Sequence, residues 1–331
     1  MEQETRADGL KRPGVMVLRR VLETRQKGVK MMKNGNRYII GLDHGNHLIK
    51  TADHIMQNGV KRLGVKPTFT ANTLNYGRAY YKVGEERGNV KDSKMVDDDY
   101  YILTLAMLAK EAKTRDIPQG AHIVLAVGMP LKQFSSERDA FIRYLKRDSQ
   151  PVSFKYEDTA YKLYIDKVVA FPQCYAAVVN RLPSMKECLI VDIGSWTIDI
   201  MEVQDGVPVE SHCETFSESL VSVIQDIRSE SSELLKKEIS ENRITAYIQG
   251  DAENIPKQHQ KLMDTALERF AARVEGLLKE NGHDTQFTDM VYVGGGAAVM
   301  QKYGRTGSNI SYIIDVKANA IGYEYIASQI T

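Results

Sequence analysis

The sequence has few cysteines, one tryptophan and no long apolar run. Its three cysteines, Cys174, Cys188 and Cys213, lack the spacing of a disulfide framework or a metal site. No stretch approaches the roughly 18 consecutive apolar residues of a membrane-spanning helix. Net charge is also scarce, because 44 basic and 43 acidic residues leave a formal charge of +1. These absences argue against general binding to nucleic acid and against membrane contact, and they favour the reducing cytoplasm.

The chain is long enough for two domains with substantial cores. A hydrophobic content of 43% beside 26% charged residues is typical of a globular protein. Residues 1–36 differ, because basic side chains outnumber acids there and the apolar patch 15–18 is too short for the core of a secretory signal. This segment is either a basic arm able to touch DNA or lipid, or a leader that precedes the true start at Met31 or Met32.

Residues 189–201, with the sequence LIVDIGSWTIDIM, organise the chain. An apolar strand ends at Asp192, turns through Gly194 and resumes as an alternating second strand. A carboxylate at a strand end can hold hydrated Mg²⁺, and a glycine turn lets backbone N–H groups approach a phosphate. We call this combination, a strand that ends in Asp-x-Gly and turns into a second strand, an acid-and-glycine corner. One such corner by itself is most often a simple hairpin.

A second copy of the corner occurs about one domain length earlier. Residues 38–51, with the sequence YIIGLDHGNHLIKT, again carry an apolar strand into Asp43 and then Gly45. Residues 290–293 form a third strand, which runs into three glycines at a strand-to-helix junction suited to an anion. One such element in each half predicts two related lobes that face each other across a cleft.

The rest of the chain alternates between predicted strands and helices, which indicates an α/β fold. We expect strand pairs at 38–56, 76–83 and 203–215, and strands at 121–127, 152–156 and 161–169. Helices are expected at 97–115, after a cap at Ser135 or Ser136, from Pro172 onward, within 217–281 around a polar peripheral stretch at 230–242, and at 315–326.

Gln173 follows Pro172, which suits the first turn of a helix, so its amide is expected at a helix start beside the cleft. Without the flanking corners, an exposed amide at a helix N-terminus would be the simpler interpretation.

Together these motifs resemble the ATPase superfamily of actin, the heat-shock chaperones and the sugar kinases. The closest resemblance is to the plasmid-segregation actins, the ParM/StbA family of bacteria. It rests, in order, on GLDHGNHLIKT, AFPQCYAA, VDIGSWTID, VYVGGGA and KANAIGY, and it covers residues 37–330. It implies a two-lobed actin-like (ribonuclease-H-like) fold with a nucleotide cleft between domain I at 37–170 and domain II at 171–331. A helical insertion at 217–281 and a final helix that packs back toward domain I are also implied.

The resemblance also implies roles for individual residues. Asp43 and Asp192 would hold Mg²⁺ through water, and Asp192 and Gln173 would position the attacking water. An alignment to the patterns of the chaperones would place the water-positioning residue at Phe171 instead of Gln173. An apolar ring cannot orient water, so Gln173 is the expected residue. Phosphate and nucleoside would be held by Gly45, Asn46, His47 and Lys50, by Gly194, Ser195, Trp196 and Thr197, and by Gly294, Gly295, Gly296 and Ala297.

Two residues depart from the family pattern. Ser195 and Trp196 replace the more common glycine and small residue, and the Trp196 ring either packs beneath the turn or meets nucleotide.

The implied function is ATP or GTP hydrolysis with Mg²⁺, coupled to self-assembly into filaments that move DNA through an adaptor protein. The alternatives are a small-molecule kinase or a non-polymerising scaffold ATPase of the same superfamily.

Overall fold

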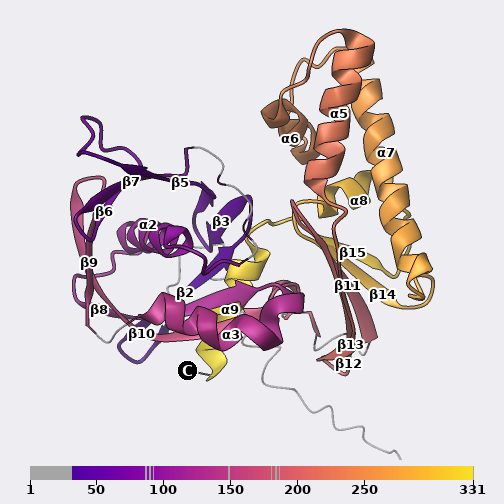
Figure 1. Ribbon diagram of the computed structural model, residues 1–331. Helices are drawn as coiled ribbons and strands as arrows, with labels where there is room; N and C mark the ends of the chain where they lie inside the picture. Colours follow the sequence, from indigo (N-terminus) through magenta and orange to yellow (C-terminus); the bar gives the residue numbers. More distant parts are fainter. Residues whose placement is uncertain are drawn as a thin grey trace, which may run out of the picture. The chain divides into compact units, whose positions relative to one another are not determined.

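The computed structural model describes residues 32–330, apart from residues 86, 87, 89, 90, 92, 148, 149, 180, 183, 184 and 186 and the side chain of Glu210 (Figure 1). Residues 32–331 form one compact unit. The predicted basic segment lies largely outside the described residues. Its last part does not, because Lys33 and Asn34 pair with the next strand and so belong to the fold rather than to an extension.

The first sheet is built from the earlier half of the chain. Its order is β4-β3-β2-β8-β10-β9-β6-β7-β5, with β1 paired to β2. The strands are β1 (Lys33–Asn34), β2 (Arg37–His44), β3 (Leu48–Thr51), β4 (Ile55–Gln57), β5 (Val60–Leu63), β6 (Thr73–Tyr76), β7 (Ala79–Val83), β8 (Ala121–Met129), β9 (Val152–Tyr156) and β10 (Thr159–Pro172).

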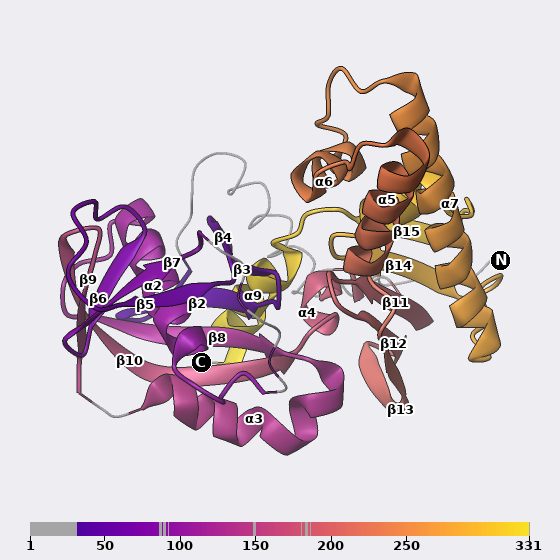
Figure 2. The same ribbon diagram turned by 45° about the horizontal axis from the view of Figure 1, so that its top comes forward.

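Strands β2 and β8 run parallel at the centre of this sheet, with Leu42 opposite Val127. Both strands are mostly apolar, and both are buried beyond their first two residues, as expected for parallel strands covered on both faces. Three helices pack on the sheet: α2 (Asp99–Thr114), α3 (Leu131–Lys146) and α9 (Ala318–Ile330) (Figures 1 and 2). Asp43 therefore lies near the end of a buried central strand.

The second sheet has the order β13-β12-β11-β14-β15. Its strands are β11 (Glu187–Ile193), β12 (Ile198–Gln204), β13 (Val207–Phe216), β14 (Asp289–Val293) and β15 (Ile310–Ile313). The helices of this half are α5 (Leu220–Leu235), α6 (Glu241–Gln249), α7 (Lys257–Glu280) and α8 (Ala297–Tyr303). The predicted apolar stripe of α7, from Met263 to Leu277, is buried in the core that these helices share with the sheet. The α/β fold with two sheets agrees with the sequence prediction.

Two helix predictions are wrong. Helix α3 begins at Leu131 after Pro130, so Ser135 and Ser136 lie within the helix and do not cap it. The expected helix from Pro172 begins only at Tyr175, as the short α4 (Tyr175–Val178), because Pro172 ends β10. Proline without an N–H donor is tolerated both at a strand end and in a first helical turn, so the residue type did not distinguish the two.

Helix α9 packs closely on β2. A Cβ atom at Gly41 would lie 2.0 Å from the carbonyl oxygen of Ala320, so only glycine fits there. The N–H group of Gly41 donates to Glu324 Oε1 at 3.1 Å. The final helix thus returns to the first sheet, as the resemblance implied. None of the helices in the described residues is long and apolar enough to cross a membrane.

Candidate functional site

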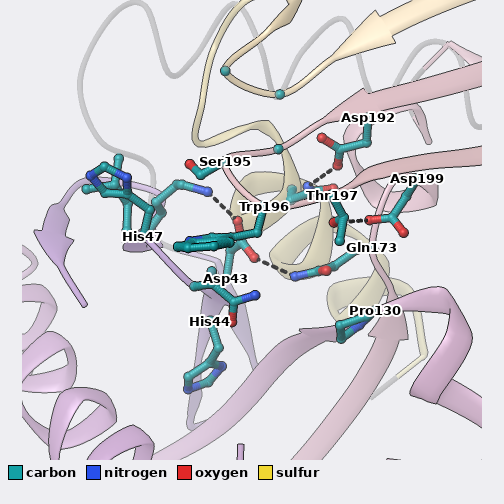
Figure 3. A pocket seen from close by; sticks show the side chains of 18 of the residues that line it. Asp43, His44, His47, Pro130, Gln173, Asp192, Ser195, Trp196, Thr197 and Asp199 are labelled. Atoms are coloured by element: carbon teal, nitrogen blue, oxygen red, sulfur yellow. Dashed lines mark hydrogen bonds and ion pairs between the residues drawn. The ribbon is translucent and has the colours of Figure 1, made fainter. Parts of the chain in front are cut away.

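Both acid-and-glycine corners are antiparallel hairpins that face a common crevice (Figure 3). In the first, Asp43 on β2 pairs in register with Lys50 on β3. In the second, Asp192 on β11 pairs in register with Asp199 on β12. The crevice has a volume of about 330 Å³, which is within the range of small-molecule sites.

Most of the predicted site residues line this crevice. These are Asp43, Gly45, Asn46, His47, Lys50, Gln173, Asp192, Gly194, Ser195, Trp196, Thr197, Gly294 and Gly295. Gly296 and Ala297 do not line it, because Gly296 packs on Ile193 and Ala297 is fully buried. Trp196 is among the crevice residues, so its side chain borders the space where a ligand would lie.

Asp43 is 3% exposed and holds two partners at the end of β2. The ammonium of Lys50 lies 2.8 Å from its Oδ2 atom, and the side-chain amide of Gln173 donates to its Oδ1 atom at 3.0 Å. Although burial acts to lower the pKa of Lys50, the charges of Asp43 and Asp192 raise it. Lys50 therefore stays protonated, and it is able to attract phosphate.

Gln173 reaches Asp43 from the end of β10. Its backbone N–H donates to Met129 O at 2.8 Å, which extends the pairing of β10 with β8 by one residue. Cys174 then adopts a left-handed conformation with φ of 71° before α4 begins. Gln173 thus stands at a strand end, not at a helix start, and it still lies beside the crevice as expected.

Asp192 is buried at the end of β11, where Asn319 Nδ2 donates to its Oδ2 atom at 3.1 Å. Burial and the nearby charge of Asp199 raise the pKa of Asp192 to about 6. Asp199 is itself held by the hydroxyls of Thr215 at 2.6 Å and Thr197 at 3.2 Å. Two carboxylates in a dry corner favour a cation or a donor between them.

The glycine junction after β14 touches this corner. Gly294 has φ of +82°, and a Cβ atom there would lie 2.3 Å from Asp192 Oδ1 and 2.8 Å from Ile193 O. Glycine is required at this position both by the backbone conformation and by the close approach of Asp192.

Three residues of the site were missed from the sequence. Asp199 is identifiable in retrospect as the residue opposite Asp192 in the predicted hairpin. Asn319 lies in the closing KANAIGY motif, but nothing local indicates its partner. Lys94 lines the crevice from the segment before α2, which carries no motif at all.

The residues present fit hydrated magnesium. Among the described residues, no group of three or more His, Cys, Asp or Glu side chains is arranged to bind a metal directly. Asp43 and Asp192 nevertheless bring hard oxygen ligands to one crevice. Mg²⁺ usually keeps several waters and takes one or two carboxylates plus substrate phosphates, which matches this sparse set.

Comparisons with known proteins cover both halves of the chain. Residues 41–175 match the N-terminal domain of actin like proteins, and residues 190–303 match the C-terminal domain of archaeal actin homologue MreB-like proteins. No curated protein sequence matches the chain.

Solved structures share the fold at low sequence identity. Ta0583, an archaeal actin homologue, has a TM-score of 0.72 at 16% identity over 88% of this chain and 99% of its own; its ADP complex scores 0.69 at 17% identity with the same coverage. The Alp12 filament structure scores 0.65 at 16% identity over 89% and 99%. Bacillus thuringiensis ParM with ATP scores 0.65 at 13% identity over 89% and 99%. These likenesses confirm the predicted two-lobed fold.

Proposed function

Since the chain belongs to the actin-like proteins, with residues 41–175 matching an actin-like N-terminal domain and residues 190–303 an archaeal MreB-like C-terminal domain, we propose that it binds and hydrolyses ATP with Mg²⁺ and assembles into filaments. The observation that carries the proposal is the meeting of Asp43 and Asp192 in one crevice, although they come from different sheets. The glycine turn of each corner can present backbone N–H groups to a polyphosphate, and the two carboxylates can hold the Mg²⁺ that accompanies it.

The phosphates would lie between the two turns. On one side, the turn at 45–47 and the ammonium of Lys50 would contact the β- and γ-phosphates. On the other side, the turn at 194–197 would form a second clamp. Gly294 and Gly295 leave room for the backbone to approach the α-phosphate and nucleoside.

Hydrolysis would proceed by positioning and charge stabilisation, without a covalent intermediate. Gln173 donates one amide hydrogen to Asp43, which fixes the orientation of its side chain. Its carbonyl oxygen would accept a hydrogen bond from the attacking water, while Asp192 accepts another. Bound Mg²⁺ would neutralise phosphate charge beside Asp43 and Asp192.

Filament formation is supported by the fold neighbours, one of which is itself a filament structure. A head-to-tail contact between identical subunits is heterologous, and such a contact builds an open filament when it does not close into a ring. By the resemblance to the plasmid-segregation actins, the filament would move DNA through a DNA-binding adaptor protein at a centromere-like site.

The proposal is tested with the purified full chain, ATP and Mg²⁺. We expect phosphate release without any added acceptor, a rise in light scattering, and filaments in negative-stain micrographs. Asp192→Ala should abolish phosphate release while circular dichroism shows an unchanged fold. Phosphate transfer only after a small-molecule acceptor is added would indicate a kinase instead, and hydrolysis without assembly would indicate a scaffold ATPase.

A further inference from the structure

Lys94 is a buried lysine in the wall of the crevice. Its side chain comes from the segment that precedes α2, and the residue is only 7% exposed. Its ammonium donates to the carbonyl oxygen of His44 at 2.5 Å, directly after Asp43 on β2. It also lies over the ring of Tyr100, 5.7 Å from the centroid. Both contacts are with neutral groups.

The ammonium of Lys94 therefore has no ion-pair partner among the described residues. Two other lysines that line the crevice are paired: Lys50 contacts Asp43, and Lys91 contacts both Asp97 and Asp99. A cation that is taken out of water without an anion is costly unless a ligand supplies the negative charge. Lys94 thus places a buried positive charge in the crevice wall with no carboxylate in direct contact among the described residues.

The charged groups around Lys94 and its contact with His44 show where in the crevice its ammonium lies. Burial lowers its pKa to about 8, Asp43 and Asp199 act to raise it, and Lys50 acts to lower it. Lys94 is therefore coupled to acids of both sheets. The contact with His44 places it at the Asp43 end of the crevice, where Gln173 also lies, and this is the end at which hydrolysis would occur.

We propose that Lys94 binds the terminal phosphate of a nucleoside triphosphate and makes the protein prefer the triphosphate to the diphosphate. The inference rests on the proposed nucleotide site and names the residue that recognises the γ-phosphate there. An ADP molecule lacks the group that Lys94 contacts, so its binding does not depend on this lysine.

The test is isothermal titration calorimetry of the full chain with ADP and with the β,γ-imido analogue of ATP, both with Mg²⁺. Lys94→Met keeps the length of the side chain and removes its charge. We expect the affinity for the analogue to fall by about 10-fold to 100-fold, as for loss of a charged hydrogen bond, and that for ADP to change by less than about threefold. Lys94→Arg should retain most of the preference.

Lys91→Met is the matched control, because it removes a lysine from the same segment whose charge two aspartates already neutralise. Its ratio of analogue to ADP affinity should equal that of the wild type. Lys94→Met loses both a buried charge without an ion-pair partner and the hydrogen bond to the His44 carbonyl, which are effects of opposite sign, so it should unfold close to the wild-type temperature. Loss of the preference then reflects the missing charge and not damage to the fold.

Two results overturn the inference: an unchanged preference in Lys94→Met, or an equal loss of affinity for both nucleotides. Failure of the proposed function gives a different result, since the wild type itself would then bind neither nucleotide.

Discussion

Asn319 and Asp192 are 127 residues apart in sequence and joined by a hydrogen bond of 3.1 Å. Asn319 lies in the first turn of α9, and Glu324 of the same helix accepts a hydrogen bond from Gly41 on the strand that carries Asp43. Side chains of one helix therefore contact both the Asp192 carboxylate and the backbone of the strand that carries Asp43. It links the two acid corners, so changes in α9 should affect the chemistry of the crevice.

Asn319→Ala removes the donor that orients Asp192. We expect the hydrolysis rate to fall by about 10-fold, in the range found for groups that orient catalytic side chains, with little change in ATP affinity. Single-turnover phosphate release and a separate binding titration measure the two quantities. A loss confined to ATP affinity would contradict a role in orienting Asp192.

Gln173→Ala should slow hydrolysis by roughly 10²-fold, as for loss of a positioned catalytic group, and it should prolong the lifetime of filaments. The reason is that the variant lacks the Gln173 amide, which is hydrogen-bonded to Asp43 and would hold the attacking water in line with the terminal phosphate. Phosphate release and depolymerisation after ATP is exhausted are the measurements. Wild-type turnover in this variant would show that another residue positions the water.

Gly294→Ala should destabilise the protein and weaken ATP binding. Gly206→Ala is its matched control, because Gly206 has a φ of +79° but open space around its Cβ position, whereas a Cβ atom at Gly294 would lie 2.3 Å from Asp192 Oδ1. Both variants carry the same backbone strain. Urea denaturation should therefore show that the free energy of unfolding falls by about 1–3 kcal/mol more in Gly294→Ala than in Gly206→Ala, because only the first has the clash. Equal losses, with wild-type ATP binding in both variants, would refute the packing argument.

Stability should fall as pH rises between about 4.5 and 7 because of Glu111. This side chain is fully buried beside Arg115, and burial raises its pKa from 4.5 to about 7. The folded state then keeps a proton that the unfolded state has lost, so the free energy of unfolding decreases through this window.

Glu111→Gln cannot titrate at this position. Urea denaturation at pH 5, 6, 7 and 8 should therefore give the variant a flatter profile than the wild type. Parallel profiles would mean that Glu111 remains ionised throughout.

Nucleotide binding should change the intrinsic fluorescence. Trp196 is the only tryptophan in the chain, and it lines the crevice. Titration with ATP and Mg²⁺ should give a saturable change in emission whose midpoint matches the calorimetric dissociation constant. Binding seen by calorimetry with constant emission would place the nucleotide away from Trp196.

The corners, the main strands and most of the helices could be predicted from the sequence because their signals are local. An apolar run into Asp-x-Gly marks a strand and its turn wherever the chain carries it, and the stripe of α7 repeats with the helical period. The errors were local ambiguities too. Pro172 suited a helix start as well as a strand end, and two serines resembled a cap inside α3.

The tertiary structure alone decided which side chains meet in the crevice. Asn319 with Asp192, Gln173 with Asp43, and Lys94 with the His44 carbonyl all join residues at least 50 positions apart. Such contacts depend on how two sheets and a returning helix pack, and no local pattern encodes that packing. The sequence thus determined that two acid corners exist and predicted a cleft between them, and the fold determined which side chains meet in that cleft.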